Sequence, residues 1–336
     1  MPLNFDILIA SYFRASILEK CLVALVNSSH PSLGNIIVLT HSQDAKTLQL
    51  LETYTKKIPL VIRKVDKCLS PGASRNLLIE RSTADFVHFL DDDAFVPQRY
   101  YEQVWDYLKK NVDIDVLGGV DIPAPDTGWR QSMLGEILAS DFVMGVTAKR
   151  HKKSDSSENM NASELELTLC NLWIRAKILK DDQYTFSEKI LRCEENLLLQ
   201  QIKKDGYKIV AQPKFFVFHQ RREDLVDIAK IQFRSGFYRG VTLFSFYEKT
   251  FTIPLITGIY IFSLLFGNDS PLTILLIGLH LFLFGKSIGF NLWKKYKPIQ
   301  LLYGYLVVVA IHVFFSMGLV VGVIKEGSRR CLRPWN

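Results

Sequence analysis

The chain has 336 residues, 48% of them hydrophobic, and carries a formal charge of +7. This length suits one large or two modest domains, and the apolar residues are concentrated after about residue 250. The five cysteines are scattered and odd in number, so the sequence contains no evident disulfide framework and favours a reducing compartment.

The first ninety residues alternate short apolar runs with helical patterns, which predicts a mostly parallel, right-handed doubly wound α/β sheet. The opening residues lack the basic region of a signal peptide, so we expect this domain to stay in the cytoplasm. Ser16 and Glu19 predict a capping box at the first helix. Strands are expected at Phe5–Ala10, Asn35–Thr40, Leu60–Lys64 and Phe86–Leu90, and later helices at Ala45–Lys56 and from Pro71 to about Arg81.

Three consecutive acids, Asp91, Asp92 and Asp93, follow the strand Phe86–Leu90. Open α/β sheets bind their ligands at this carboxyl edge. Because side chains two residues apart share a face of an extended chain, Asp91 and Asp93 can address one ligand while Asp92 points elsewhere. Carboxylate oxygens suit Mg²⁺ or Mn²⁺, which often bridge phosphates. The alternative is an acidic turn that merely ends a strand.

The middle of the chain is less regular. A helix is expected at Gln98–Lys110 and a strand at Val116–Val120, whereas the polar stretch 149–158 reads as a solvated connector rather than a substrate clamp. The helix Cys193–Lys204 begins with Glu194 and Glu195. These acids either take part in the chemistry or only stabilise the helix N-terminus through its dipole. Further strands are expected at Leu167–Ile174, Lys208–Ala211 and Phe215–Phe218.

The C-terminal third predicts membrane attachment. Residues 226–247 mix basic and aromatic side chains, as in an amphipathic helix at a membrane surface, although an ordinary domain helix is the alternative. Basic groups flank the apolar segments, which favours a membrane over nucleic acid. We therefore expect a domain at 1–225, an interface segment at 226–250 and an all-α transmembrane region at 251–336 with two or three crossings. The apolar segments are Phe251–Gly267, Pro271–Leu292 and Leu301–Ile324.

Several motifs in order resemble the family 2 nucleotide-sugar glycosyltransferases, which have a GT-A fold, over roughly residues 4–220. The motif Phe89–Ala94 resembles the D-x-D metal motif, and the motif Cys193–Leu197 resembles the G-E-D-x-x-L motif. Leu39 and Thr40 stand where the family usually has paired acids. The motifs are Ile9-Ala10-Ser11-Tyr12-Phe13-Arg14, Pro71-Gly72-Ala73-Ser74-Arg75-Asn76, Phe89-Leu90-Asp91-Asp92-Asp93-Ala94, Cys193-Glu194-Glu195-Asn196-Leu197 and Phe218-His219-Gln220-Arg221.

The resemblance implies a role for each matching residue. Glu195 is the implied catalytic base, and Glu194 would contact the acceptor or cap its helix. Mg²⁺ or Mn²⁺ would be held by Asp91, Asp93 and His219, with a phosphate contact or a structural role as the alternatives for His219. The implied donor-binding residues are Ala10, Ser11, Tyr12, Arg14, Asp44, Arg75, Asp91 and Asp92.

These patterns predict a membrane-anchored, metal-dependent, inverting glycosyltransferase that is multi-pass with its active site in the cytoplasm. Its expected partners are a nucleotide sugar donor, a lipid-linked or polysaccharide acceptor and membrane lipid, but no nucleic acid. The chemistry needs a neutralised leaving diphosphate and a general base for the acceptor hydroxyl. The alternative is a non-catalytic, membrane-attached sensor or scaffold that binds nucleotide sugars, which the residues Leu39 and Thr40 favour.

Overall fold

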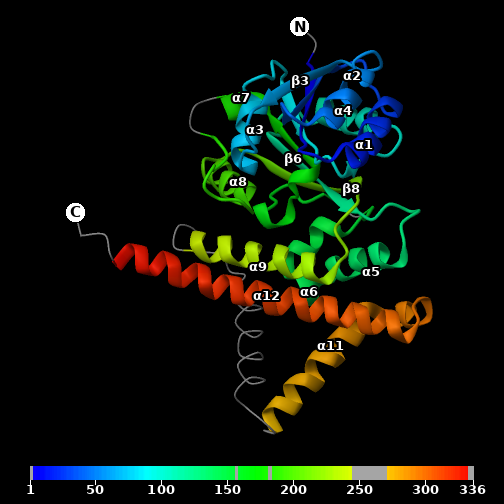
Figure 1. Ribbon diagram of the computed structural model, residues 1–336, viewed down its shortest axis with the longest axis vertical. Coiled ribbons are helices and arrows are strands. Elements are labelled where there is room, and N and C mark those ends of the chain that lie inside the picture. Colours follow the sequence, from blue (N-terminus) through cyan, green and yellow to red (C-terminus); the bar gives the residue numbers. More distant parts are fainter. Residues whose placement is uncertain (1–2, 156–157, 181–183, 244–270, 332–336) are drawn as a thin grey trace. The chain divides into compact units, whose positions relative to one another are not determined.

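The structure, a computed structural model, describes residues 3–155, 158–180, 184–243 and 271–331 (Figure 1). The predicted apolar segment Phe251–Gly267 lies outside these residues. The chain divides into two compact units: Met1–Pro125 with Lys149–Arg221, and Asp126–Ala148 with Arg222–Asn336. The boundaries expected at residues 225 and 250 stay a prediction.

The first unit contains an eight-stranded sheet in the order β3-β2-β1-β4-β7-β6-β8-β5. The four predicted N-terminal strands pair in parallel, but β7 begins beside the end of β4, with Leu172 opposite Phe89, and runs back. Strand β5 is also antiparallel to its neighbour, so among the described strands the sheet is mixed, with four parallel and three antiparallel pairings. The strands are β1 (Phe5–Ala10), β2 (Leu33–His41), β3 (Leu60–Val65), β4 (Phe86–Phe89), β5 (Ala94–Phe95), β6 (Val116–Ile122), β7 (Leu172–Arg175) and β8 (Ile209–His219).

Helices cover both faces of this sheet (Figure 1), which confirms the predicted α/β class. Alternation along β1 sends Ile7 and Ile9 to one apolar core and Leu8 to the other. The predicted capping box is wrong, because α1 begins at Ala15 and its N-cap residue Arg14 makes no side-chain cap bond. One face carries α1 (Ala15–Asn27), α2 (Ala45–Tyr54) and α4 (Tyr100–Lys110), and the other α3 (Pro71–Ile79), α7 (Ala176–Lys180) and α8 (Glu194–Lys204).

The second unit is helical, with an apolar core that includes Met133, Ile137, Val307 and Ile311. Among the residues that the structure describes, only 298–328 form a helix long and apolar enough to cross a bilayer, judged by length and composition alone. The multi-pass prediction is therefore not supported. The helices are α5 (Trp129–Leu138), α6 (Asp141–Met144), α9 (Leu225–Thr242), α11 (Pro271–Lys295) and α12 (Pro298–Cys331).

Helices α9 and α12 pack backbone against backbone through two pairs of glycines. A Cβ atom on Gly236 would lie 2.0 Å from the carbonyl oxygen of Phe315, and one on Gly318 would lie 2.0 Å from that of Phe233. Gly240 and Gly322, one turn further on each helix, are equally crowded. Small residues spaced by four allow such close approach, so this crossing depends on glycine at these positions.

Candidate functional site

The three acids of the sheet edge divide between the protein interior and the surface. Asp92 is 3% exposed and accepts a hydrogen bond of 2.7 Å from Ser11 Oγ. Arg14 donates from Nη1 to Asp92 and from Nη2 to Asp93, both at 2.6 Å. Burial raises the pKa of Asp92 to about 7, against the lowering effect of the Arg14 charge. Ser11 and Arg14, which follow β1, therefore fix the acids that follow β4.

Asp91, Asp93 and His219 form a cluster that fits a divalent cation. Their ligand atoms all lie within 4.8 Å of one another, and His219 Nε2 is 3.1 Å from Asp93 Oδ1. Burial acts to raise the pKa of Asp93, but the hydrogen bonds and charges of His219 and Arg14 hold it below its usual range. Two carboxylates with one imidazole nitrogen suit Mn²⁺ or Mg²⁺, since both prefer hard donors.

Asp121 at the end of β6 orients His219 from the opposite side. The Nδ1 atom of His219 lies 2.8 Å from Asp121 Oδ2, which leaves Nε2 facing Asp93. Asp121 is 1% exposed, and the charges of Arg221 and His151 hold its pKa well below the usual range despite burial.

Asp121, Cys170 and His219 form a second group of possible ligands. Burial raises the pKa of the Cys170 thiol to about 11, so this sulfur stays protonated and is a poor ligand at neutral pH. The surroundings therefore favour the cluster of Asp91, Asp93 and His219 for a cation.

Arg75 links the acidic edge of the sheet to helix α8. It projects from the first turns of α3, whose N-terminus is capped by Ser70 Oγ. Its Nη1 atom donates to Glu194 Oε1, and its Nη2 atom lies 3.6 Å from Asp91 Oδ1. The next residue, Asn76, holds the segment before α8 by bonds of 3.0 and 2.9 Å to the backbone of Phe186. The Arg75 guanidinium thus lies between the acids of the sheet edge and those of α8, where its donors can bind an anion.

Glu194 and Glu195 begin α8 and are 4% and 8% exposed. Burial raises the pKa of Glu194 to about 7, against the charge of Arg75. Glu195 Oε1 lies 3.6 Å from Arg150 Nη1. Burial also raises the pKa of Asp91, and the charges of Asp93 and Glu195 contribute in the same direction, which puts Glu195 within electrostatic reach of the acidic edge.

Arg150 and His151 are site residues that the sequence did not reveal. Arg150 donates to the carbonyl oxygens of Leu165 and Glu164 at 2.9 and 2.6 Å, and His151 Nδ1 lies 2.7 Å from Asp121. The prediction of a solvated connector at 149–158 is wrong for these two residues. A local run of basic residues carries no signal that two of them are held by distant acids.

The other predicted donor-binding residues lie around the ends of β1 and β2. Ala10 ends β1, and the Tyr12 hydroxyl is 2.9 Å from Ser74 Oγ. Asp44 caps α2 and accepts a 2.6 Å bond from the backbone nitrogen of Phe13, whose φ is +56°. Leu39 and Thr40 are both fully buried.

The chain is similar to distant relatives whose names describe glycosyltransferases. Poly(ribitol-phosphate) beta-N-acetylglucosaminyltransferase TarS of Staphylococcus aureus is 22% identical over 225 residues, which cover 66% of this chain and 36% of TarS. An uncharacterized glycosyltransferase of Methanocaldococcus jannaschii is 25% identical over 180 residues, 53% of this chain and 57% of that protein. The chain thus spans about a third of the length of TarS.

Solved structures share the fold. A mannosyltransferase of Pyrobaculum calidifontis in complex with GDP-Man and Mn²⁺ superposes with a TM-score of 0.63 at 10% identity, covering 96% of this chain and 88% of that one. S. aureus TarS 1-349 in complex with UDP-GlcNAc gives 0.53 at 14% identity, covering 99% and 93%. The sequence pattern described as Glycosyl transferase family 2 matches residues 6–181, more than half of the chain. The chain therefore belongs to glycosyl transferase family 2.

Proposed function

We propose that this chain is a metal-dependent, inverting glycosyltransferase that moves a sugar from a nucleotide diphosphate sugar to a membrane-associated glycan or polymer. The observation that carries this proposal is the convergence of Asp91, Asp93 and His219 with Arg75 and Glu194 at one edge of the sheet, with Glu195 the next residue of α8. This set combines groups for binding a diphosphate with carboxylates suited to general-base work.

The leaving-group side is assigned to Asp91, Asp93 and His219. A divalent cation bound there would neutralise the diphosphate that departs from the sugar. Arg75 and the N-terminus of α3 would bind diphosphate oxygens directly, because both present donors to an anion. Asp121 holds the His219 ring in the required orientation, and Arg14 keeps Asp93 ionised.

The acceptor side is assigned to the start of α8. Glu195 would accept the proton of the acceptor hydroxyl as that oxygen attacks the anomeric carbon from the face opposite the leaving group, so that the configuration inverts. The Oε1 atom of Glu194 is engaged by Arg75, so that oxygen is not free to take a proton, and the residue is suited to orient Arg75 and the acceptor. The distance of 3.6 Å between Arg150 and Glu195 allows Arg150 to steady that carboxylate.

The acceptor is the part of the proposal that depends most on relatives. TarS and a beta-glucosyltransferase of Bacillus spizizenii are both named for poly(ribitol-phosphate). The apolar helix α12 suits a protein that works beside a bilayer. We propose a hydroxyl-bearing polymer or lipid-linked glycan at the cytoplasmic membrane surface, where nucleotide sugars are available.

The test is transfer of label by the purified full chain. UDP-GlcNAc, UDP-glucose and GDP-mannose would each be supplied with Mn²⁺ or Mg²⁺ and either poly(ribitol phosphate) or a lipid-linked glycan. Chromatography would detect labelled acceptor, and NMR of the product would report the anomeric configuration. A Glu195→Gln variant serves as the matched inactive protein. Retained configuration, or transfer that survives excess chelator, would contradict the mechanism.

A second candidate is a nucleotide-sugar sensor or scaffold without catalysis. It is favoured by Leu39 and Thr40, whose side chains are buried where the family usually has paired acids. Tight donor binding without transfer to any acceptor, and equal binding by the Glu195→Gln variant, would support this candidate.

A further inference from the structure

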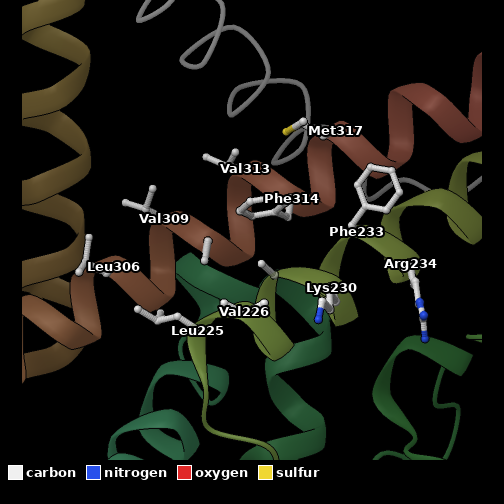
Figure 2. A pocket seen from close by; sticks show the side chains of 12 residues that line it. Leu225, Val226, Lys230, Phe233, Arg234, Leu306, Val309, Val313, Phe314 and Met317 are labelled. Carbon is white, nitrogen blue, oxygen red and sulfur yellow. The ribbon is translucent and has the colours of Figure 1, made fainter.

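A groove of about 650 Å³ runs between α9 and α12 in the second unit (Figure 2). This volume lies within the range of about 300–1,000 Å³ that is typical of small-molecule sites. Most of its walls are apolar and open to the surface, with Leu306 and Met317 45% and 47% exposed. The groove-lining residues all precede Gly236 and Gly318, so the close glycine crossing closes one end of the groove.

Two basic side chains edge the groove. Lys230 and Arg234 are one helical turn apart on α9, and Figure 2 shows both extending to the same side of that helix. Both are exposed, and within the described part of the chain neither has a hydrogen-bond or ion-pair partner. Their aliphatic stems line the groove while their charged ends can reach an anion at its edge.

We propose that this groove binds one anionic phospholipid, with an acyl chain between α9 and α12 and the phosphate on Lys230 and Arg234. The apolar walls disfavour a nucleotide or a sugar, because the hydroxyl groups of either would lose their hydrogen bonds to water. An acyl chain gains from burial along such a surface, and paired cations attract anionic headgroups. The inference rests on contact of the second unit with a bilayer but not on sugar transfer by the first.

Photo-crosslinking tests the site directly. The full chain would be reconstituted into phosphatidylcholine vesicles that contain phosphatidylglycerol with a diazirine in its acyl chain. After illumination, mass spectrometry should find label in 225–234 and 306–317. Unlabelled phosphatidylglycerol should displace it, whereas phosphatidylcholine and inorganic phosphate should not. Displacement by inorganic phosphate would show a simple anion site and overturn the proposal.

Two variants distinguish the contribution of the two cations to lipid binding from that of the apolar groove. Lys230→Gln with Arg234→Gln should weaken phosphatidylglycerol labelling on the order of tenfold, since each cation near an anionic headgroup contributes favourably. Ala310→Trp fills the groove and should abolish labelling. The matched controls are Lys46→Gln with Lys110→Gln on the first unit, and Val320→Trp at an apolar position of α12 beyond the groove that is 56% exposed.

The pattern of labelling decides the outcome. Label spread evenly over Val320, Ile324 and the groove would show only that lipid surrounds α12, and would overturn the proposal. An unlabelled groove would show that this lipid does not bind there and would overturn the proposal equally. Donor binding by the first unit is measured on the same samples. Groove labelling in a protein that transfers no sugar would leave the lipid site standing while the proposed function fails.

Discussion

His219 Nε2 lies 3.1 Å from Asp93 Oδ1, while the other ring nitrogen lies 2.8 Å from Asp121. The imidazole is therefore held between two carboxylates, and its Nε2 atom faces the acidic edge of the sheet. Two atoms that share a proton at this distance can share a cation once the proton leaves, because both are lone-pair donors. This relationship underlies the first prediction.

Asp93→Asn should reduce sugar transfer to background while the fold is retained. The change keeps the shape of the side chain but removes the charge that a cation and Arg14 both require. Transfer assays with and without excess chelator, together with far-UV circular dichroism, provide the measurement. Asp106→Asn, an exposed acid on α4, is the control and should keep full activity. Chelator-resistant turnover by the unmodified protein would remove the metal from the mechanism.

Glu195→Gln should bind donor normally and lose transfer by about 10²–10⁴-fold, the usual contribution of a general base. Glu194→Gln should act mainly through acceptor affinity, because Glu194 is tied to Arg75. Measuring kcat and KM for both substrates separates the two variants. A dead Glu194→Gln beside an active Glu195→Gln would shift the base by one residue. Full activity of both would place the base elsewhere.

Asp121→Asn should destabilise the first unit by about 3–5 kcal/mol at neutral pH, because it leaves Arg221 and its neighbours without a buried counter-charge. The pKa of Asp121 is lowered in the folded state, so its stabilisation is present above the unfolded pKa of about 3.9 and is lost as the pH falls through the folded value. Urea unfolding should thus show a difference that shrinks as the pH falls below about 4.

The control for this measurement is Asp113→Asn, which removes an exposed acid paired with Lys208 and should change stability little. A difference between Asp121→Asn and the unmodified chain that grows as the pH falls below about 4 would contradict the assigned ionisation state.

Gly318→Ala should lower the thermal stability of the second unit. The added methyl group would meet the backbone of Phe233 and force α9 and α12 apart. Gly278→Ala is the matched control, since a Cβ there meets nothing within 4 Å, and helix propensity makes it neutral or stabilising by up to about 1 kcal/mol. Thermal unfolding in detergent compares the two. Equal melting temperatures would show that the crossing tolerates a methyl group.

Local patterns predicted the elements of the first unit well, because strands such as Phe5–Ala10 and helices such as α2 are encoded by short-range periodicity and turn residues. The family match likewise confirms the resemblance that came from the ordered motifs. What failed depends on distant contacts. The capping box at Ser16 was displaced because Arg14, one residue before the helix, is held by acids at the end of β4.

The same reason explains what the sequence could not reveal about the site. Arg150 and His151 lie in a basic run that resembles a solvated loop, yet the partners of Arg150 are 14 to 46 residues away in sequence and that of His151 is 30 residues away. The glycines of α9 and α12 likewise carry no local signal, because the need for glycine at Gly236 and Gly318 arises only when the two helices pack together. Contacts between segments that are distant in the chain produce no periodic pattern in the sequence.

The acids at the carboxyl edge of the sheet and at the start of α8 already have cationic partners within the protein. Arg14 serves Asp92 and Asp93, Arg75 serves Asp91 and Glu194, and Arg150 lies beside Glu195. A divalent ion that arrives alone would add charge to surroundings whose acids are already partly neutralised, whereas one that arrives with a diphosphate brings its own counter-charge. Cation and nucleotide should therefore bind cooperatively, and by thermodynamic reciprocity each should raise the affinity of the other by the same factor.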